Sequence, residues 1–245
     1  MLNERKVLEG RKVLVADDEP FNLSIVSRMM RELGCLDVWT AASGSEALQY
    51  LDGFRAPPDV AVLDFNMPGR NGLQILKQVR IGDLPMPRDL RVMMLTGSSD
   101  FGLVGAAMAL DVDAFIIKPV SLQGMAARLD KVLHGSQDIK AKPDYMKIDI
   151  DAVSQRLLSR KPVGLAKTKP QEKKAGPSGI PTRLEFAKPG MILSEEVRSP
   201  TGELLLGKAT MLNERLIRRL TELKDAIRLD HLYVFPPGET KAAEV

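Results

Sequence analysis

The chain has a single cysteine and few aromatic rings. Cys35 is the only cysteine in 245 residues, so no disulfide can form within the chain, and packing is its expected role. Aromatic residues make up 4% of the sequence against 44% for all hydrophobic residues, which favours an aliphatic core. The first ten residues, MLNERKVLEG, lack the apolar stretch of a signal peptide, and no apolar run could span a bilayer. We therefore expect a cytoplasmic protein without membrane insertion.

Polar side chains follow four short apolar runs, each at the point where a buried strand would end. The runs are Val13–Ala16, Val60–Leu63, Val92–Leu95 and Phe115–Ile117. The polar residues after them are Asp17 and Asp18, Asp64, Thr96 and Lys118. In an open parallel sheet all strand C-termini lie along one edge, where ligands bind. Three carboxylates suit a hard cation and a lysine with a hydroxyl suits a phosphoryl group, so the pattern predicts a Mg²⁺-dependent aspartyl-phosphate switch.

Each of these residues has an ordinary structural explanation when it is taken alone. Asp17 and Asp18 precede a proline and would suit the start of a helix, and Lys118 lies at an ordinary strand-to-loop transition. Single motifs of this kind often mislead. The conjunction favours function, because acidic and phosphate-binding groups at the same end of successive strands are hard to obtain by chance.

Amphipathic stretches separate the apolar runs, as alternating strands and helices require. The expected helices cover 21–33, 43–51 and 71–79, a stretch that begins at Ser98, and 121–134. The sequence therefore predicts an α/β fold with a doubly wound, five-stranded parallel sheet.

The segments that carry these residues resemble the receiver domain of bacterial two-component response regulators. They are VLVADDE at 13–19, VAVLDFNMPGRNG at 60–72, VMMLTGSS at 92–99 and AFIIKP at 114–119. The resemblance implies a flavodoxin-like receiver, which we place at 10–135. It makes Asp64 the phosphoacceptor and Mg²⁺ the cofactor. It also implies that Asp18 binds Mg²⁺ directly, that Asp17 acts through water and that the backbone carbonyl of Asn66 completes the protein ligands.

The same resemblance assigns the groups that would respond to the phosphoryl group. Thr96 would be the switch hydroxyl, Lys118 the phosphate partner and Phe115 the switch aromatic. The implied partner is a sensor histidine kinase or a phosphotransfer protein. Phe115 lacks the hydroxyl of a tyrosine. Asp111 replaces a glycine often found where the fourth helix turns into the fifth strand, so we expect a modest stability cost from a left-handed backbone conformation at Asp111.

The composition changes after Gly135. Residues 136–181 are rich in Lys and Pro and read as a basic, flexible linker, with a short helix near 149–159. Residues 182–236 regain apolar periodicity and predict a small α+β module, followed by a disordered tail at 237–245. The expected module has strands at Leu184–Phe186, Met191–Leu193, Leu204–Leu206 and Leu232–Phe235, and a helix at Asn213–Leu223.

Part of this module resembles a small domain found beside receiver or HD-GYP domains in cyclic-dinucleotide signalling proteins. The sequence offers no HD pair, because Asp230-His231 has the reverse order. Arg156 and Arg160 form the RxxxR half of a PilZ-type nucleotide site, but the second half is missing. The resemblance implies an accessory or adaptor module, and no separate catalytic output domain is recognised, so we do not expect an enzyme.

Three classes of output remain open. The leading one is a response regulator that acts through an unknown downstream protein, and a homodimer is one option because so small a module needs support. A DNA-binding transcriptional regulator is the second, and an enzymatic output, which no further catalytic constellation supports, is the third. A cyclic-dinucleotide adaptor is a further alternative. Basic residues cluster near the predicted C-terminal helix, but strands precede that helix where a helix-turn-helix needs another helix. The net charge is only +3, so nucleic acid is not a favoured partner.

Overall fold

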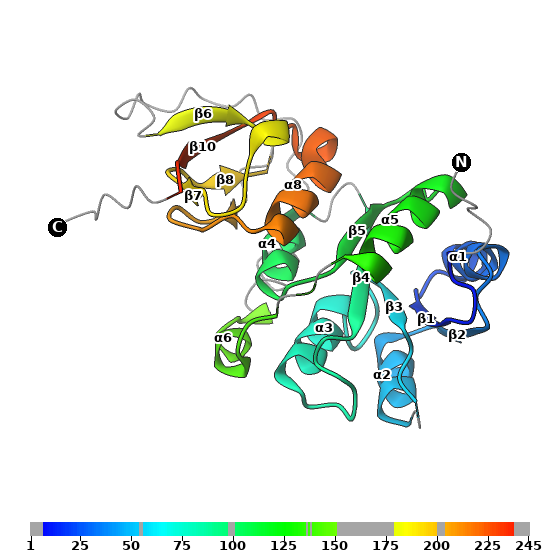
Figure 1. The fold of residues 1–245 in the computed structure, drawn as a ribbon. Helices are drawn as coiled ribbons and strands as arrows, with labels where there is room; N and C mark the ends of the chain where they lie inside the picture. Colours follow the sequence, from blue (N-terminus) through cyan, green and yellow to red (C-terminus); the bar gives the residue numbers. More distant parts are fainter. Residues whose placement is uncertain are drawn as a thin grey trace, which may run out of the picture. The chain divides into compact units, whose positions relative to one another are not determined.

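A computed structural model describes residues 7–53, 56–97, 101–135, 137, 139–150, 179–199 and 204–237. The chain divides into two compact units, Met1–Ile150 and Asp151–Val245, which we describe one at a time (Figure 1). Ser98, the predicted helix near 149–159 beyond Ile150, the Arg156–Arg160 motif and the tail from 238 lie outside the described residues.

The N-terminal unit is built on a five-stranded sheet whose strands all run parallel. Its strands are β1 (Lys12–Ala16), β2 (Asp37–Ala41), β3 (Val60–Asp64), β4 (Arg91–Thr96) and β5 (Ala114–Ile117). Their spatial order is β2-β1-β3-β4-β5, so the order of winding reverses at β1 (Figure 1). The predicted doubly wound parallel sheet is confirmed, and its switch point lies between β1 and β3.

Four helices connect these strands, namely α1 (Pro20–Glu32), α2 (Gly44–Gly53), α3 (Gly72–Ile81) and α4 (Phe101–Ala109), and α5 (Leu122–His134) follows the last strand. Local chemistry explains several boundaries. Asn71 and Gln74 form a capping box at the start of α3, and Gly82 ends that helix in the left-handed region at φ 74°. The Ser121 side chain caps α5.

Alternate residues of each strand point to opposite faces of the sheet, and both faces are buried. On one face, Val13, Val62 and Leu95 pack in a cluster with residues of α1 and α5 such as Met30 and Leu129. Edge strand β2 is less buried than the central strands, with the pattern exposed, intermediate, intermediate, intermediate, buried. Its sequence DVWTA contains no long apolar run, so apolar runs alone do not predict this strand.

The N-terminal unit continues beyond α5. Residues 139–150, which we call the strap, contain the short helix α6 (Lys142–Met146) and pack against α3. Tyr145 is fully buried and Ile150 is 3% exposed. The strap lies within the Lys/Pro-rich stretch that the sequence analysis places in a linker from 136. A buried tyrosine in a basic stretch gives little periodic signal, so composition alone does not reveal this packing.

The C-terminal unit has a three-stranded sheet, a two-stranded sheet and one long helix among residues 179–199 and 204–237. The sheets have the orders β6-β10-β7 and β8-β9. The elements are β6 (Ile180–Arg183), the 3₁₀ helix η2 (Leu184–Phe186), β7 (Ile192–Leu193), β8 (Val197–Arg198), β9 (Leu204–Leu206), α8 (Glu214–Ile227) and β10 (His231–Phe235). The strand-rich module with one helix agrees with the expected α+β class, and Asn213 caps α8 as the helix pattern predicts.

The predicted strand at Leu184–Phe186 is wrong. The strand that pairs with β10 is β6, whose register ends with Arg183 opposite His231. Beyond that pair Leu184 N still donates to Asp230 O at 3.3 Å, and the chain then turns into the 3₁₀ helix with Ala187 N donating to Leu184 O. Pro181 lies inside β6, where it is tolerated because β6 is at the edge of its sheet.

Within the described ranges, no helix combines the length and apolarity needed to cross a membrane.

Candidate functional site

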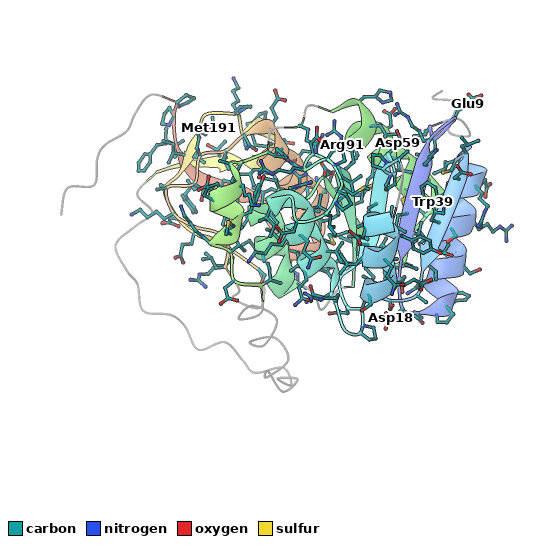
Figure 2. All side chains as sticks on the ribbon, turned by 90° about the horizontal axis from the view of Figure 1, so that it is seen from below. Glu9, Asp18, Trp39, Asp59, Arg91 and Met191 are labelled. Atoms are coloured by element: carbon teal, nitrogen blue, oxygen red, sulfur yellow. The ribbon has the colours of Figure 1, made fainter. Side chains whose placement is uncertain are left out.

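Polar side chains from the C-terminal ends of four strands meet at one edge of the N-terminal sheet. Asp17 directly follows β1, Asp64 ends β3, Thr96 ends β4 and Lys118 directly follows β5. One carboxylate oxygen from each of Asp17, Asp18 and Asp64 lies within 4.8 Å of the others. Figure 2 shows Asp18 at the opposite end of the strands from Arg91.

Lys118 joins two of the three acids. Its Nζ lies 2.6 Å from Asp64 Oδ1 and 2.9 Å from Asp17 Oδ2. Burial lowers the pKa of this ammonium, but the hydrogen bonds to Asp64 and Asp17 outweigh burial and leave the pKa raised. The lysine therefore stays charged and holds β1 and β3 together at the site edge. The contact with Asp17 could not be read from the sequence, because strand order decides which carboxylates flank the lysine.

Asp64 is buried, with 5% of its surface exposed. Asn66 N donates to its Oδ2 at 2.9 Å, and its backbone carbonyl packs so closely on Gly72 that an added Cβ there would collide with it. Burial raises the pKa of Asp64 to about 6, although the hydrogen bond and charge of Lys118 oppose that rise. The carboxyl is therefore mostly ionised at neutral pH and neutral in mild acid.

The remaining predicted residues surround this centre. Thr96 is fully buried, and its Oγ1 donates to the carbonyl of Gly97 at 3.1 Å. Phe115 is also fully buried, with its ring centroid 6.3 Å from that of Phe65. Asn66 is exposed beside the acids. The structure thus gathers Asp17, Asp18 and Asp64 with Lys118, places Asn66 next to them, and leaves Thr96 bonded to its own loop.

The donor set fits a hard divalent cation. Three carboxylates face a single ammonium, so the cluster carries more negative than positive charge, and oxygen ligands of this kind are those that Mg²⁺ prefers. The adjacent lysine lies where it would meet a phosphoryl oxygen. Chemically, the edge offers a candidate cation site next to a buried carboxylate that is mostly ionised at neutral pH.

The shifted pKa predicts how Asp64→Asn should alter stability. The folded-state pKa of about 6 exceeds the ordinary value of 3.8, so the folded state binds this proton more tightly than the unfolded state. Asp64 therefore costs stability as pH rises from about 4 to 6, by up to roughly 3 kcal/mol above pH 6. Asp64→Asn avoids that cost. In chemical denaturation, the free energy of unfolding of the variant should rise relative to that of the parent between pH 4 and 7.5.

A divalent cation supplies the control for this experiment. Mg²⁺ should reduce the advantage of Asp64→Asn at pH 7.5, because it binds more tightly to the parent, which keeps all three carboxylates. A stability gap that stays constant from pH 4 to 7.5 would contradict the environment that we describe for Asp64.

Known proteins resemble the N-terminal half of the chain in sequence. A family model described as the response regulator receiver domain matches residues 13–130. Chemotaxis protein CheY1 of Helicobacter pylori strain J99 is 33% identical over 127 residues, which cover 52% of this chain and 99% of that protein. The alkaline phosphatase synthesis transcriptional regulatory protein PhoP of Bacillus subtilis is 32% identical over 140 residues, or 57% of this chain and 55% of PhoP.

A solved receiver domain from Clostridium thermocellum covers 50% of this chain and 94% of its own, with 27% identity and a TM-score of 0.46. Membership of a family follows from the sequence matches, because this chain aligns at above 30% identity with nearly the whole length of CheY1. With its sheet order and its cluster of acids around Lys118, the chain belongs to the response regulator receiver family of two-component systems.

Proposed function

We propose that this chain is a phosphorylation switch in which Asp64 accepts a phosphoryl group from a phosphohistidine of a sensor kinase or phosphotransfer protein. The observation that carries the proposal is the contact of Lys118 Nζ with Asp64 Oδ1 at 2.6 Å, beside two further acids. A purely structural ion pair would not need Asp17 and Asp18 within 4.8 Å of the same carboxylate. Clustered carboxylates repel one another, so their convergence favours a functional role.

The transfer itself is a substitution at phosphorus. An oxygen of ionised Asp64 attacks, an O–P bond forms, and the N–P bond to the donor imidazole breaks, with the electron pair and then a proton going to the imidazole nitrogen. The pKa of about 6 leaves Asp64 ionised at neutral pH and more basic than an ordinary aspartate. The hydrogen bond from Asn66 N to Oδ2 holds the carboxylate in a fixed orientation.

Asp17, Asp18 and Asp64, with the backbone carbonyl of Asn66, would hold Mg²⁺. When it is bound, the cation neutralises the charge between the carboxylate and the phosphoryl oxygens. Lys118 then exchanges its bond to Asp64 for one to the phosphoryl group. Two charge-assisted hydrogen bonds, from Lys118 and Thr96, supply about 1.5–3 kcal/mol each. Part of this gain is offset because Lys118 gives up its bond to Asp64, so these two contacts alone fall short of the roughly 5.5 kcal/mol needed to reverse a 1:99 equilibrium.

The output that we propose is protein binding. Within 179–199 and 204–237, α8 is preceded by strands and a 3₁₀ turn, so a helix pair for a DNA groove is not found there. Phe115 is buried and has no hydroxyl to offer a partner, so a surface change would have to come from elements around it. The C-terminal unit is then an accessory docking module.

Incubation with acetyl phosphate and Mg²⁺ tests this function. Intact mass spectrometry should show one added phosphate that survives acid and is lost in base. Chelation of Mg²⁺ should strongly reduce the incorporation, because repulsion between the acids and the donor is then uncompensated. Lys118→Ala should still take up some phosphate but lose the accompanying change in amide exchange over α4. Phosphate uptake that is insensitive to chelation would overturn the metal assignment.

A further inference from the structure

Cationic side chains from α3 and from the loop before β4 donate hydrogen bonds to the strap. Backbone carbonyls of Lys140 and Ile148 accept hydrogen bonds from Arg88 Nη2 at 2.9 Å and Lys77 Nζ at 2.7 Å. Just before the strap, Gly135 O accepts from Arg91 Nη2 at 2.9 Å. Figure 2 places Arg91 at the end of the strands opposite Asp18. A mere linker would not need cations from three parts of the receiver.

The strongest anchor joins the strap to the turn between α4 and β5. Tyr145 is fully buried, and its hydroxyl donates to Asp111 Oδ2 at 2.7 Å while accepting from Lys140 N at 2.7 Å. Lys140 Nζ also lies 3.2 Å from Asp111 Oδ1 and donates to Ala109 O at 3.0 Å. Asp111 adopts the left-handed region at φ 53°. A side chain at this unfavourable position is thus used to bind the strap.

Two elements run from this anchor to the phosphorylation edge. Helix α4 begins a few residues after Thr96 and ends at Ala109, whose carbonyl the strap holds. Strand β5 begins beside Asp113 and ends just before Lys118. Thr96 Oγ1 donates to Gly97 O at 3.1 Å, so a bond from Thr96 to a phosphoryl group would break this contact with the residue that follows β4. The strap fits the arrangement that exists before this change.

We propose that the strap is an autoinhibitory clamp, which stabilises the unphosphorylated arrangement of α4 and β5 by holding Asp111 through Tyr145 and Lys140. This inference rests on the proposed function of Asp64. Because coupling between two sites is reciprocal, phosphorylation of Asp64 loosens the strap, and release of the strap favours phosphorylation. The strap precedes the C-terminal unit in the sequence.

Hydrogen exchange of the full-length chain tests the clamp. Phosphorylation by acetyl phosphate and Mg²⁺ should accelerate exchange over residues 139–150 by about fivefold or more. Tyr145→Phe should already exchange there roughly tenfold faster without phosphate, because it loses a hydrogen bond to a buried carboxylate. Its strap should respond little to phosphorylation, and its phosphorylated fraction at limiting acetyl phosphate should exceed that of the parent.

Tyr50→Phe is the matched control, because it removes a tyrosine hydroxyl from α2 in the same unit and should behave as the parent. The intact mass of the protein distinguishes a failure of the proposed function from a failure of the clamp alone. A chain that takes up no phosphate would overturn the proposed function and the clamp with it. A phosphorylated parent with unchanged exchange over 139–150, or a Tyr145→Phe variant with the parent's phosphorylated fraction, would overturn the clamp alone.

Discussion

Asp64→Ala should take up no phosphoryl group under conditions in which the parent becomes fully phosphorylated. The expected loss is complete, because Asp64 combines a raised pKa, an ion pair with Lys118 and a position within 4.8 Å of two further acids. A neutral, shorter side chain leaves no nucleophile at that point. Intact mass after incubation with acetyl phosphate and Mg²⁺ measures the loss directly.

Two variants make this result specific. Asp59→Ala removes an acid that pairs with Arg11 and lies at the opposite end of the strands from Asp18 in Figure 2, so phosphorylation should persist. Asp18→Ala should stay folded yet need much more Mg²⁺, because it loses one proposed ligand and relieves repulsion among the acids. Undiminished labelling of Asp64→Ala would show that another residue is the acceptor.

Asp113→Ala should cause the largest loss of stability among these substitutions, about 3–5 kcal/mol. The side chains of Asp113 and Arg80 are 1% and 0% exposed and form a salt bridge of 2.9 Å. Asp113 also accepts a hydrogen bond from Val92 N at 2.8 Å. Alanine would leave a buried guanidinium charge and a buried N–H group without this partner. The midpoint and slope of urea denaturation measure the change.

The half-exposed ion pair between Arg11 and Asp59 provides the comparison for this loss. Asp59→Ala should cost about 1 kcal/mol, because pairs in contact with water contribute little. Replacing both buried partners, as Arg80→Met with Asp113→Leu, should recover much of the stability, since no uncompensated charge then remains. Equal losses for Asp113→Ala and Asp59→Ala would mean that burial does not govern the strength of these pairs.

The sequence predicts the receiver sheet well for a physical reason. Each central strand is buried on both faces and reads as a continuous apolar run, such as Val60–Leu63. Helix boundaries are legible where side chains cap them, as Asn71 does for α3. The gathering of Asp17, Asp64 and Lys118 follows from parallel topology alone, because residues after parallel strands must share one edge.

Features that depend on contacts far apart in the sequence escape this reasoning. Tyr145 and Asp111 lie 34 residues apart, so no local pattern predicts their hydrogen bond. The basic composition of the strap indicates a linker and not a packed segment. The aspartate at position 111, where a glycine is often found, is the one sequence feature that points to this contact. In the C-terminal unit, the apolar triplet Leu184–Phe186 resembles a strand, but the chain turns into a 3₁₀ helix there, directly after Arg183 pairs with His231. Short strands of two to four residues carry too few alternations to fix their type.

Pro181 has a consequence for how copies of this chain can meet. It lies in β6, an outer strand only four residues long, and proline lacks the backbone N–H that an incoming strand would need. Edge strands that carry proline are poor templates for the addition of another strand. If the C-terminal unit self-associates, we expect side chains to make the contact rather than a sheet continued across two molecules through β6. The same residue should protect the unit from edge-to-edge aggregation when the protein is concentrated.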